Sequence, residues 1–217
     1  MSLRLDWCDI KAAKYAVQKW HYSGSYTIFP CVTVGAWEDN QFVGAVIFAR
    51  GANKHIGSPY GLTMYECNEL VRVALSGKQQ SPTSQIVAGA VKMLRQKEPA
   101  IRLLVSYADP NQDHIGTLYQ AMNWAYVGKS PGGYVYKWTD GKLYHQREVS
   151  KTGWKPYFGE PRQVPKIDEC EKVWQDGKYK YLYPLDKAMR RQIEPLALPY
   201  PKRADVGEIE SRLSTTE

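Results

Sequence analysis

The sequence lacks the cysteine pairs that are typical of zinc knuckles and disulfide frameworks. Its four cysteines are widely separated and form no CxxC pair: Cys8, Cys31, Cys67 and Cys170. The first ten residues have no apolar core of a secretory signal, and no run of about 18 apolar residues is present that could span a bilayer. We therefore expect a reduced, soluble protein of the cytoplasm with no membrane partner.

Phenylalanine is also scarce, with 4 residues against 16 Tyr and 7 Trp. Aromatic rings with a polar edge suit surfaces that stack on bases, and they equally suit half-buried strands. The 29 Lys and Arg residues outnumber 22 Asp and Glu, so the net charge is +7. A positive chain favours an anionic partner such as nucleic acid, although a merely basic soluble protein fits the charge equally well.

The pattern of apolar residues predicts alternating helices and strands in a chain long enough for one domain with a buried core. Asp9 is placed to cap the first helix, which should end near Ser23-Gly24. The other predicted elements are strands at 31–37 and 42–49, a loop at 50–65, a strand at 69–75, a helix at 83–95, a buried strand at 101–107, a helix at 115–124, and strands at 126–128, 134–138 and 179–183. This order predicts a mixed α/β sheet.

The character of the chain changes after residue 140. Residues 141–203 contain many prolines and carry 14 Lys and Arg against 8 Asp and Glu. We therefore predict a catalytic core over 1–140, a basic Pro- and Tyr-rich extension packed on it over 141–203, and a flexible tail over 204–217.

The order of elements resembles that of the GNAT acyltransferases. On this resemblance, residues 69–75 form the fourth strand, 102–107 form the fifth, and 83–95 form the helix between them. The resemblance implies a mixed central sheet with helices on both faces. It also implies a V-shaped splay between the fourth and fifth strands, in which an acyl-CoA donor lies.

Several blocks more narrowly resemble the phage Mom family of adenine-modifying proteins. They are WHYSG (20–24), VGAVIFARGAN (43–53), IGSPYGL (56–62), ELVRVAL (69–75), SPTS (81–84), SYADP (106–110), GTLYQAMNWAYVG (116–128) and KYKYLYPL (178–185). The resemblance implies a transferase that converts adenine N6 in double-stranded DNA to a carbamoylmethyl (glycinamide) derivative and so protects phage DNA from host restriction. Because N6 is not accessible to a deep pocket inside a stacked duplex, base flipping is expected.

The donor site departs from the GNAT pattern. The usual Q/RxxGxG/A cradle is replaced by SGKQQSPTSQIVAGA, in which the glycine spacing is wrong. Ser81, Thr83 and Ser84 at the start of a helix could still hold an anion, and Arg72 is expected to contact donor or DNA phosphate. An acetyl-CoA-like donor would give an acetamide and not glycinamide, so a glycyl group carried on tRNA is a second candidate.

The candidate catalytic residues follow from the resemblance and from their positions. Asp109 follows the buried strand and could assist removal of an N6 proton, although an Asp-Pro pair also simply ends strands. Tyr119 could protonate a leaving group or be a core residue. His21 and Tyr22, at the end of the first helix, could stack on a flipped adenine. The family is associated with iron, for which His21 and Asp109 are the candidate ligands.

The candidate DNA-binding residues are basic or polar and lie in the loop at 50–65 and in the extension: Arg50, Asn53, Lys54, Lys151, Lys155, Arg190 and Arg191. Glu69 and Arg72 are three residues apart, so strict alternation predicts that they face opposite sides of the sheet.

Two other functions fit the same sequence. One is a GNAT N-acyltransferase that acts on a small amine or a protein lysine, and the other is a nucleic-acid-binding module without catalysis. An adenine methyltransferase is excluded because no aromatic follows Asp109-Pro110 and no glycine-rich loop follows a first strand. The sequence leaves a monomer and a dimer equally open.

Overall fold

A computed structural model describes residues 2–26, 31–51, 53–157 and 159–203. The chain divides into two compact units: the first contains residues 1–108, 115–128 and 179–217, and the second contains 109–114 and 129–178. The expected tail at 204–217 lies outside the described residues. No described helix has the length and apolar character needed to cross a membrane.

The first unit is built on a seven-stranded sheet with the order β1-β2-β3-β4-β5-β12-β6. The strands are β1 (Leu3–Trp7), β2 (Cys31–Glu38), β3 (Gln41–Ala49), β4 (Cys67–Leu75), β5 (Leu103–Ala108), β6 (Ala125–Lys129) and β12 (Tyr179–Pro184). β4 and β5 pair in parallel. β1 with β2, β2 with β3, β3 with β4 and β12 with β5 pair antiparallel. The expected mixed α/β architecture is therefore confirmed.

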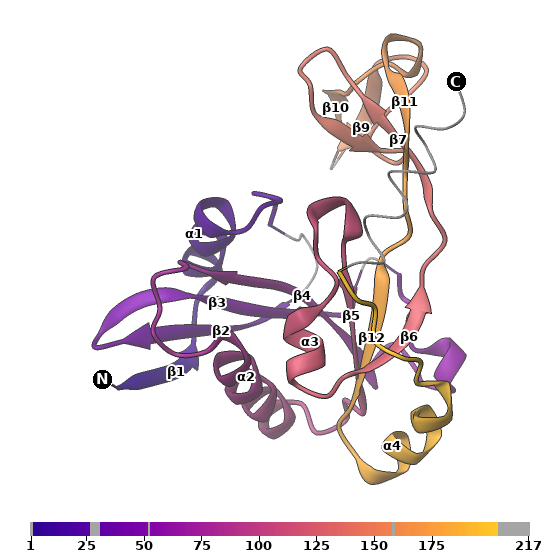
Figure 1. The fold of residues 1–217 in the computed structure, drawn as a ribbon. Helices are drawn as coiled ribbons and strands as arrows, with labels where there is room; N and C mark the ends of the chain where they lie inside the picture. Colours follow the sequence, from indigo (N-terminus) through magenta and orange to yellow (C-terminus); the bar gives the residue numbers. More distant parts are fainter. Residues whose placement is uncertain (1, 27–30, 52, 158, 204–217) are drawn as a thin grey trace. The chain divides into compact units, whose positions relative to one another are not determined.

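Helices cover both faces of this sheet (Figure 1). α1 (Ile10–Trp20) places Ala13, Ala16 and Val17 against one face, where they pack on Ala45 and Ile47 of β3. α2 (Thr83–Lys97) packs on the opposite face through a row of buried apolar residues. α3 (Thr117–Ala121) lies with α2, and α4 (Lys187–Ile193) packs through Met189 and Ile193 on β5 and β12. Burial of these apolar stripes is the main force that holds the layers together.

Local chemistry sets the boundaries of the first elements. The Asp9 carboxylate accepts a hydrogen bond from the N–H of Ala12 at 2.7 Å, which caps α1 as predicted. The β2–β3 hairpin turns at Asp39 and Asn40, which both have positive φ, and these two residue types tolerate that conformation better than most. The expected hairpin is thus confirmed.

The second unit consists of two small antiparallel sheets. One has the order β11-β7-β8, formed by β7 (Gly133–Lys137), β8 (Leu143–His145) and β11 (Glu171–Gln175). The other is the hairpin of β9 (Trp154–Tyr157) and β10 (Glu160–Gln163). Most of this unit is inserted between β6 and β12, which are neighbours in the large sheet.

Several elements differ from the prediction. β1, β8 to β11 and α4 had no strong periodic signal, and the expected helix at 115–124 shortens to Thr117–Ala121. The residues on either side of α3 explain its length, because Gly116 and Asn123 both adopt positive φ and interrupt the helix. The units also do not coincide with the expected division at residue 140, since the strand at 134–138 belongs to the second unit and β12 belongs to the central sheet.

Candidate active site

The parallel pairing of β4 and β5 ends after three residues. Cys67, Asn68 and Glu69 pair with Leu103, Leu104 and Val105, and the two strands then part. β4 continues along β3 as far as Leu75, while β5 continues along β12 as far as Ala108. The expected splay between the fourth and fifth strands is therefore confirmed.

Ser106 lies on β5 directly after the last paired residue. Its hydroxyl forms hydrogen bonds with the carbonyl oxygen of Leu70 at 2.8 Å and with the phenol of Tyr119 at 2.7 Å. The single proton of the Ser106 hydroxyl thus has two acceptors within reach, the Leu70 carbonyl and the phenol oxygen of Tyr119. A buried hydroxyl pair therefore links β4, β5 and α3 where the strands part.

Tyr119 is held in a cluster of aromatic rings. Its ring centroid is 5.1 Å from those of both Trp124 and Tyr181. Burial raises the pKa of Tyr119 to about 12, an effect that the hydrogen bond with Ser106 opposes and that the neighbouring Tyr22 and Glu69 increase. The phenol is thus fully protonated at neutral pH, and it can donate a proton more readily than it can accept one.

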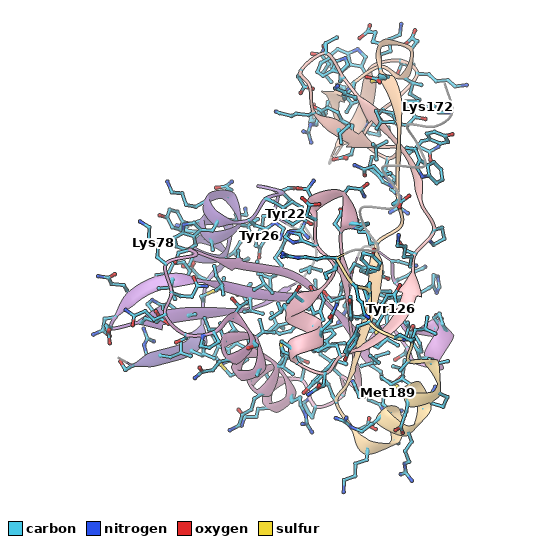
Figure 2. The ribbon with its side chains drawn as sticks, in the orientation of Figure 1. Tyr22, Tyr26, Lys78, Tyr126, Lys172 and Met189 are labelled. Carbon is cyan, nitrogen blue, oxygen red and sulfur yellow. The ribbon has the colours of Figure 1, made fainter. Side chains whose placement is uncertain are left out.

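The segment after α1 carries His21 and Tyr22, whose ring centroids lie 4.4 Å apart with an interplanar angle of 31°. The Nδ1 atom of His21 accepts a hydrogen bond from the N–H of Ser23 at 3.2 Å. Neutral His21 therefore carries its proton on Nε2. Figure 2 labels Tyr22 and Tyr26 in this segment, which belongs to the first unit together with Tyr119.

Arg72 anchors this same segment. Its Nε donates to the carbonyl oxygen of Ser25 at 3.4 Å, and its Nη1 donates to that of Val71 at 2.6 Å. A role for Arg72 in phosphate binding remains a prediction, and its observed contacts hold the chain beside His21 and Tyr22.

A bulge in β4 changes the expected orientation of Glu69 and Arg72. Ile47 pairs with Arg72 and Phe48 pairs with Leu70, so Val71 is an extra residue on β4. Glu69 and Arg72 therefore pair with Ala49 and Ile47, which lie on one face of β3. The prediction that the two charged residues face opposite sides was wrong, because simple alternation fails across a bulge.

The loop before α2 already holds an anion from the protein itself. The buried Glu38 carboxylate accepts hydrogen bonds from the backbone N–H groups of Gln80 and Ser81, each at 2.8 Å. These bonds and the Ser81 hydroxyl lower the pKa of Glu38. Ser81, an expected donor-binding residue, thus contacts Glu38, while Thr83 and Ser84 begin α2 directly after Pro82.

This arrangement does not fit the pyrophosphate of a CoA donor. A phosphate group at residues 80–81 would compete with Glu38 for the same N–H groups and would lie beside a negative charge. Glu38 therefore disfavours a pyrophosphate at residues 80–81.

Asp109 belongs to the second unit, where it forms a tight ion pair. One carboxylate oxygen accepts hydrogen bonds from the backbone and side chain of Asn111 at 3.0 and 2.9 Å, and the other lies 2.9 Å from Nζ of Lys178. The residue is only 8% exposed. Burial would raise the pKa of Asp109, but Lys178 and Asn111 lower it overall, so the carboxylate is ionised.

The candidate iron ligands His21 and Asp109 belong to different units. Within the part of the chain that the structure describes, no group of three or more His, Cys, Asp or Glu side chains could hold a metal ion. We therefore assign no iron-binding role to His21 and Asp109.

The expected DNA-binding residues are divided between the units. Lys151 and Lys155 lie in the second unit, and Arg50, Asn53, Lys54, Arg190 and Arg191 lie in the first. Arg50 lies over the ring of Tyr65 at 4.6 Å, and the Asn53 side chain accepts from the N–H of His55. Arg190 and Arg191 occupy the last turn of α4. Their contact with DNA remains a prediction.

The sequence analysis did not identify Ser106, Lys178 or Glu38. Ser106 is a single polar residue in an otherwise apolar strand, which is a usable signal. Lys178 and Glu38 resemble ordinary surface residues, and nothing local to them predicts their partners.

Comparison with known proteins gives one family. The model of the Mom protein family matches residues 2–202. The chain is 23% identical over 209 residues to the methylcarbamoylase mom of Escherichia phage Mu, covering 92% of this chain and 84% of that protein.

Solved structures with a similar fold are acetyltransferases. The IAA acetyltransferase of Bacillus cereus ATCC 14579 has a TM-score of 0.46 and 10% identity, covering 85% of this chain and 100% of that chain. The ribosomal-protein-S18-alanine N-acetyltransferase of Escherichia coli has a TM-score of 0.45 and 8% identity, covering 85% of this chain and 95% of that one.

Proposed function

This chain belongs to the Mom protein family, and we propose that it is a transferase that converts the N6 amine of adenine in duplex DNA into a carbamoylmethyl derivative. The observation that carries the proposal is the parting of β4 and β5, with the Ser106–Tyr119 hydroxyl pair at the point of parting. The name of the phage Mu relative, a methylcarbamoylase, supports the nature of the transferred group. The same activity would protect phage DNA from host restriction.

The reaction makes two demands on the protein. A bond forms between N6 and the methylene carbon of the incoming group, N6 loses one proton, and the leaving group departs with its bonding electrons. The N6 lone pair is delocalised into the ring, so acceptance of the N6 proton must accompany bond formation. The protein must also supply a proton or a positive potential to the leaving group.

Tyr119, in the first unit, is the proposed donor to the leaving group, and the assistance of Asp109, in the second unit, to removal of the N6 proton stays a prediction from the sequence. Tyr119 is protonated at neutral pH and can donate through its phenol, and its link to Ser106 holds the ring in one orientation. Asp109 is an ionised carboxylate that can accept a hydrogen bond from the N6 amine. In this prediction Asp109 accepts the N6 proton as the bond to carbon forms, and because Lys178 and Asn111 lower its pKa, it is a weak base.

His21 and Tyr22 are the proposed contacts with the extruded base. Their rings lie 4.4 Å apart at a tilt of 31°, and Tyr22 is largely exposed, so its ring is accessible for stacking on a planar adenine. Arg72 holds this segment through Ser25, which keeps the rings in place.

The proposal requires no CoA pyrophosphate at the start of α2. Glu38 occupies the N–H groups of Gln80 and Ser81 just before α2, which disfavours a CoA-dependent N-acyltransferase acting on a small amine or a lysine. A glycyl ester of tRNA contains the two carbons and the nitrogen of the product substituent. To give that product, N6 must replace the amine on the methylene carbon, the amine must replace the tRNA oxygen on the carbonyl carbon, and the tRNA hydroxyl must leave with the proton lost from N6. The polyanionic tRNA carrier suits the charge of +7.

The test is expression in a bacterial host followed by mass analysis of the nucleosides in its DNA. The wild type should yield a modified adenosine heavier by one carbamoylmethyl group. Tyr22→Ala, Tyr119→Phe and Asp109→Ala should each reduce that peak, and their matched controls are Tyr15→Ala, Tyr126→Phe and Asp113→Ala. Unmodified adenosine from well-folded wild-type protein would refute the proposal.

A further inference from the structure

The second unit carries an exposed pair of aromatic rings that no part of the proposed active site uses. Tyr134 on β7 and Trp174 on β11 pair directly across the two strands. Their ring centroids lie 5.0 Å apart at an interplanar angle of 76°, and their exposed fractions are 52% and 53%. Two large rings so exposed leave much apolar surface in water unless a ligand covers it.

The face of the β7–β11 pair that carries Tyr134 and Trp174 becomes buried farther along β7. Tyr136 is two residues along β7 on the same face, and it is only 7% exposed. The core of the second unit is therefore complete at Tyr136 without the pair. Tyr134 and Trp174 extend the same aromatic row beyond the core and into solvent.

The backbone fixes the orientation of Trp174. A Cβ added at Gly132 would lie 2.7 Å from Cζ2 of Trp174 and 2.9 Å from the carbonyl oxygen of Gln175. Gly132 has no such atom, so the indole packs closely on the backbone there. With the Tyr134 ring also set edge to face against it, the indole is held in place before any ligand binds.

The side chain of Lys172 places a positive charge over the ring of Tyr134. Nζ of Lys172 lies 4.9 Å from the ring centroid of Tyr134, on the strand that carries Trp174 (Figure 2). The acidic residue of β11 next to it, Glu171, alternates to the opposite face, where it lies 3.9 Å from Nζ of Lys137. The aromatic pair thus has a positive charge at its side.

We infer that Tyr134, Trp174 and Lys172 form a platform that stacks on unpaired bases of a DNA single strand. Exposed rings stack on base faces whatever the sequence, and an adjacent ammonium group neutralises the phosphate that follows the base. Base pairs within a duplex cover these faces with their neighbours, so the ligand must be unstacked. The charge of Lys172 favours a nucleic acid over an uncharged or cationic partner.

This inference deepens the proposed function, because extrusion of a target adenine leaves bases nearby without their stacking partners. It is nonetheless separable from that function, since a platform can bind single strands whether or not the protein modifies adenine. The experiment therefore measures binding alone and needs no donor.

The full-length protein is titrated into a fluorescein-labelled single-stranded oligonucleotide of mixed sequence, and the affinity is measured by anisotropy. Trp174→Ala should weaken binding by about 5- to 150-fold, which corresponds to the loss of one stacked base. Trp174→Phe should retain most of the affinity, and Gly132→Ala should weaken binding by displacing the indole. Lys172→Gln should reduce the slope of log affinity against log salt by about 0.7.

The matched control is Trp154→Ala, which removes another exposed tryptophan, 54% accessible, from the separate β9–β10 hairpin. It should leave single-strand affinity unchanged. Equal affinities for wild type and Trp174→Ala, with both proteins folded by circular dichroism, would overturn the inference. An equal loss of affinity for fully paired duplex would also overturn it, because stacking on unpaired bases predicts a larger loss on single strands.

Discussion

At the scale of single residues, the hydroxyl of Ser106 supports the parting of the two central strands. The pairing of β4 with β5 ends at Glu69 and Val105, and the Ser106 hydroxyl donates to the carbonyl oxygen of Leu70, the next residue of β4. A side chain can thus compensate a backbone group that the splay would leave unpaired. The same hydroxyl positions the phenol of Tyr119.

We expect Ser106→Ala to lower both stability and modification. The Leu70 carbonyl loses its partner in a buried place, which costs about 1–3 kcal/mol. Tyr119 also loses the bond that opposes the rise of its pKa. Chemical denaturation measures the first effect and nucleoside mass analysis the second. Ser106→Thr keeps the hydroxyl and should retain much of the stability and of the modification activity. Unchanged stability in Ser106→Ala would contradict this account.

A second residue-scale prediction concerns Lys178. Removal of its ammonium group leaves the Asp109 carboxylate buried beside Asn111 alone, so the pKa of Asp109 should rise in Lys178→Ala. The cost should be about 1 kcal/mol, because the side chain of Lys178 is about half exposed and its charge is screened. Titration by carbonyl NMR measures the pKa, and Lys151→Ala in the same unit is the control. An unchanged Asp109 pKa would show that Asn111 alone sets it.

At the scale of elements, Glu38 joins the end of β2 to the start of α2. Its carboxylate accepts hydrogen bonds from the backbone N–H groups of Gln80 and Ser81, which lie directly before the N-cap Pro82 of α2. The contact therefore stabilises the loop at 76–82 and at the same time excludes an external anion. The Glu38 carboxylate accepts hydrogen bonds from this loop as a phosphate group does in nucleotide-binding loops.

The pH dependence of this contact can be predicted in sign. The folded pKa of Glu38 lies below its ordinary value of 4.5, so its contribution to stability is fully present above pH 4.5 and is lost as pH falls through the folded pKa. Glu38→Gln should therefore have a lower melting temperature than wild type at neutral pH, and the difference should shrink in acid. Glu98→Gln, at the exposed end of α2, is the control. A difference that stays constant with pH would contradict a role for the charge.

At the scale of the whole molecule, the second unit is an insertion between two neighbouring strands. β6 leaves the central sheet at Lys129 and β12 re-enters it at Tyr179. At this border the N–H of Ser130 donates to the carbonyl oxygen of Lys178 at 2.8 Å, and the N–H of Lys178 donates to the Ser130 hydroxyl at 2.9 Å. The chain thus enters and leaves the second unit at adjacent points.

Replacement of residues 131–177 by Asn-Gly should therefore leave the first unit folded. A two-residue turn matches the hydrogen-bonded pair of Ser130 and Lys178, and Asn-Gly is the preferred sequence for such a turn. The shortened protein should unfold cooperatively in calorimetry and should lose single-strand binding with the platform. Loss of all cooperative unfolding would show that the first unit depends on the second.

Local patterns in the sequence were sufficient for most of the first unit. The cap at Asp9, the β2–β3 hairpin, α2 and the buried strand β5 follow from periodicity and turn residues that act within a few positions. The order of these elements, with the quoted blocks, also led to the family that the comparisons found. The second unit gave weaker signals because its strands are short and mostly exposed.

Only the tertiary structure decided the chemistry of the candidate site. The contacts of Glu38 with Ser81 and of Asp109 with Lys178 join residues far apart in the chain, and the bulge at Val71 places Arg72 on the same face as Glu69. Periodicity reports which side chains are buried, because burial depends on the local pitch of a helix or strand. It does not report which charges meet, because that depends on where distant segments return to one another.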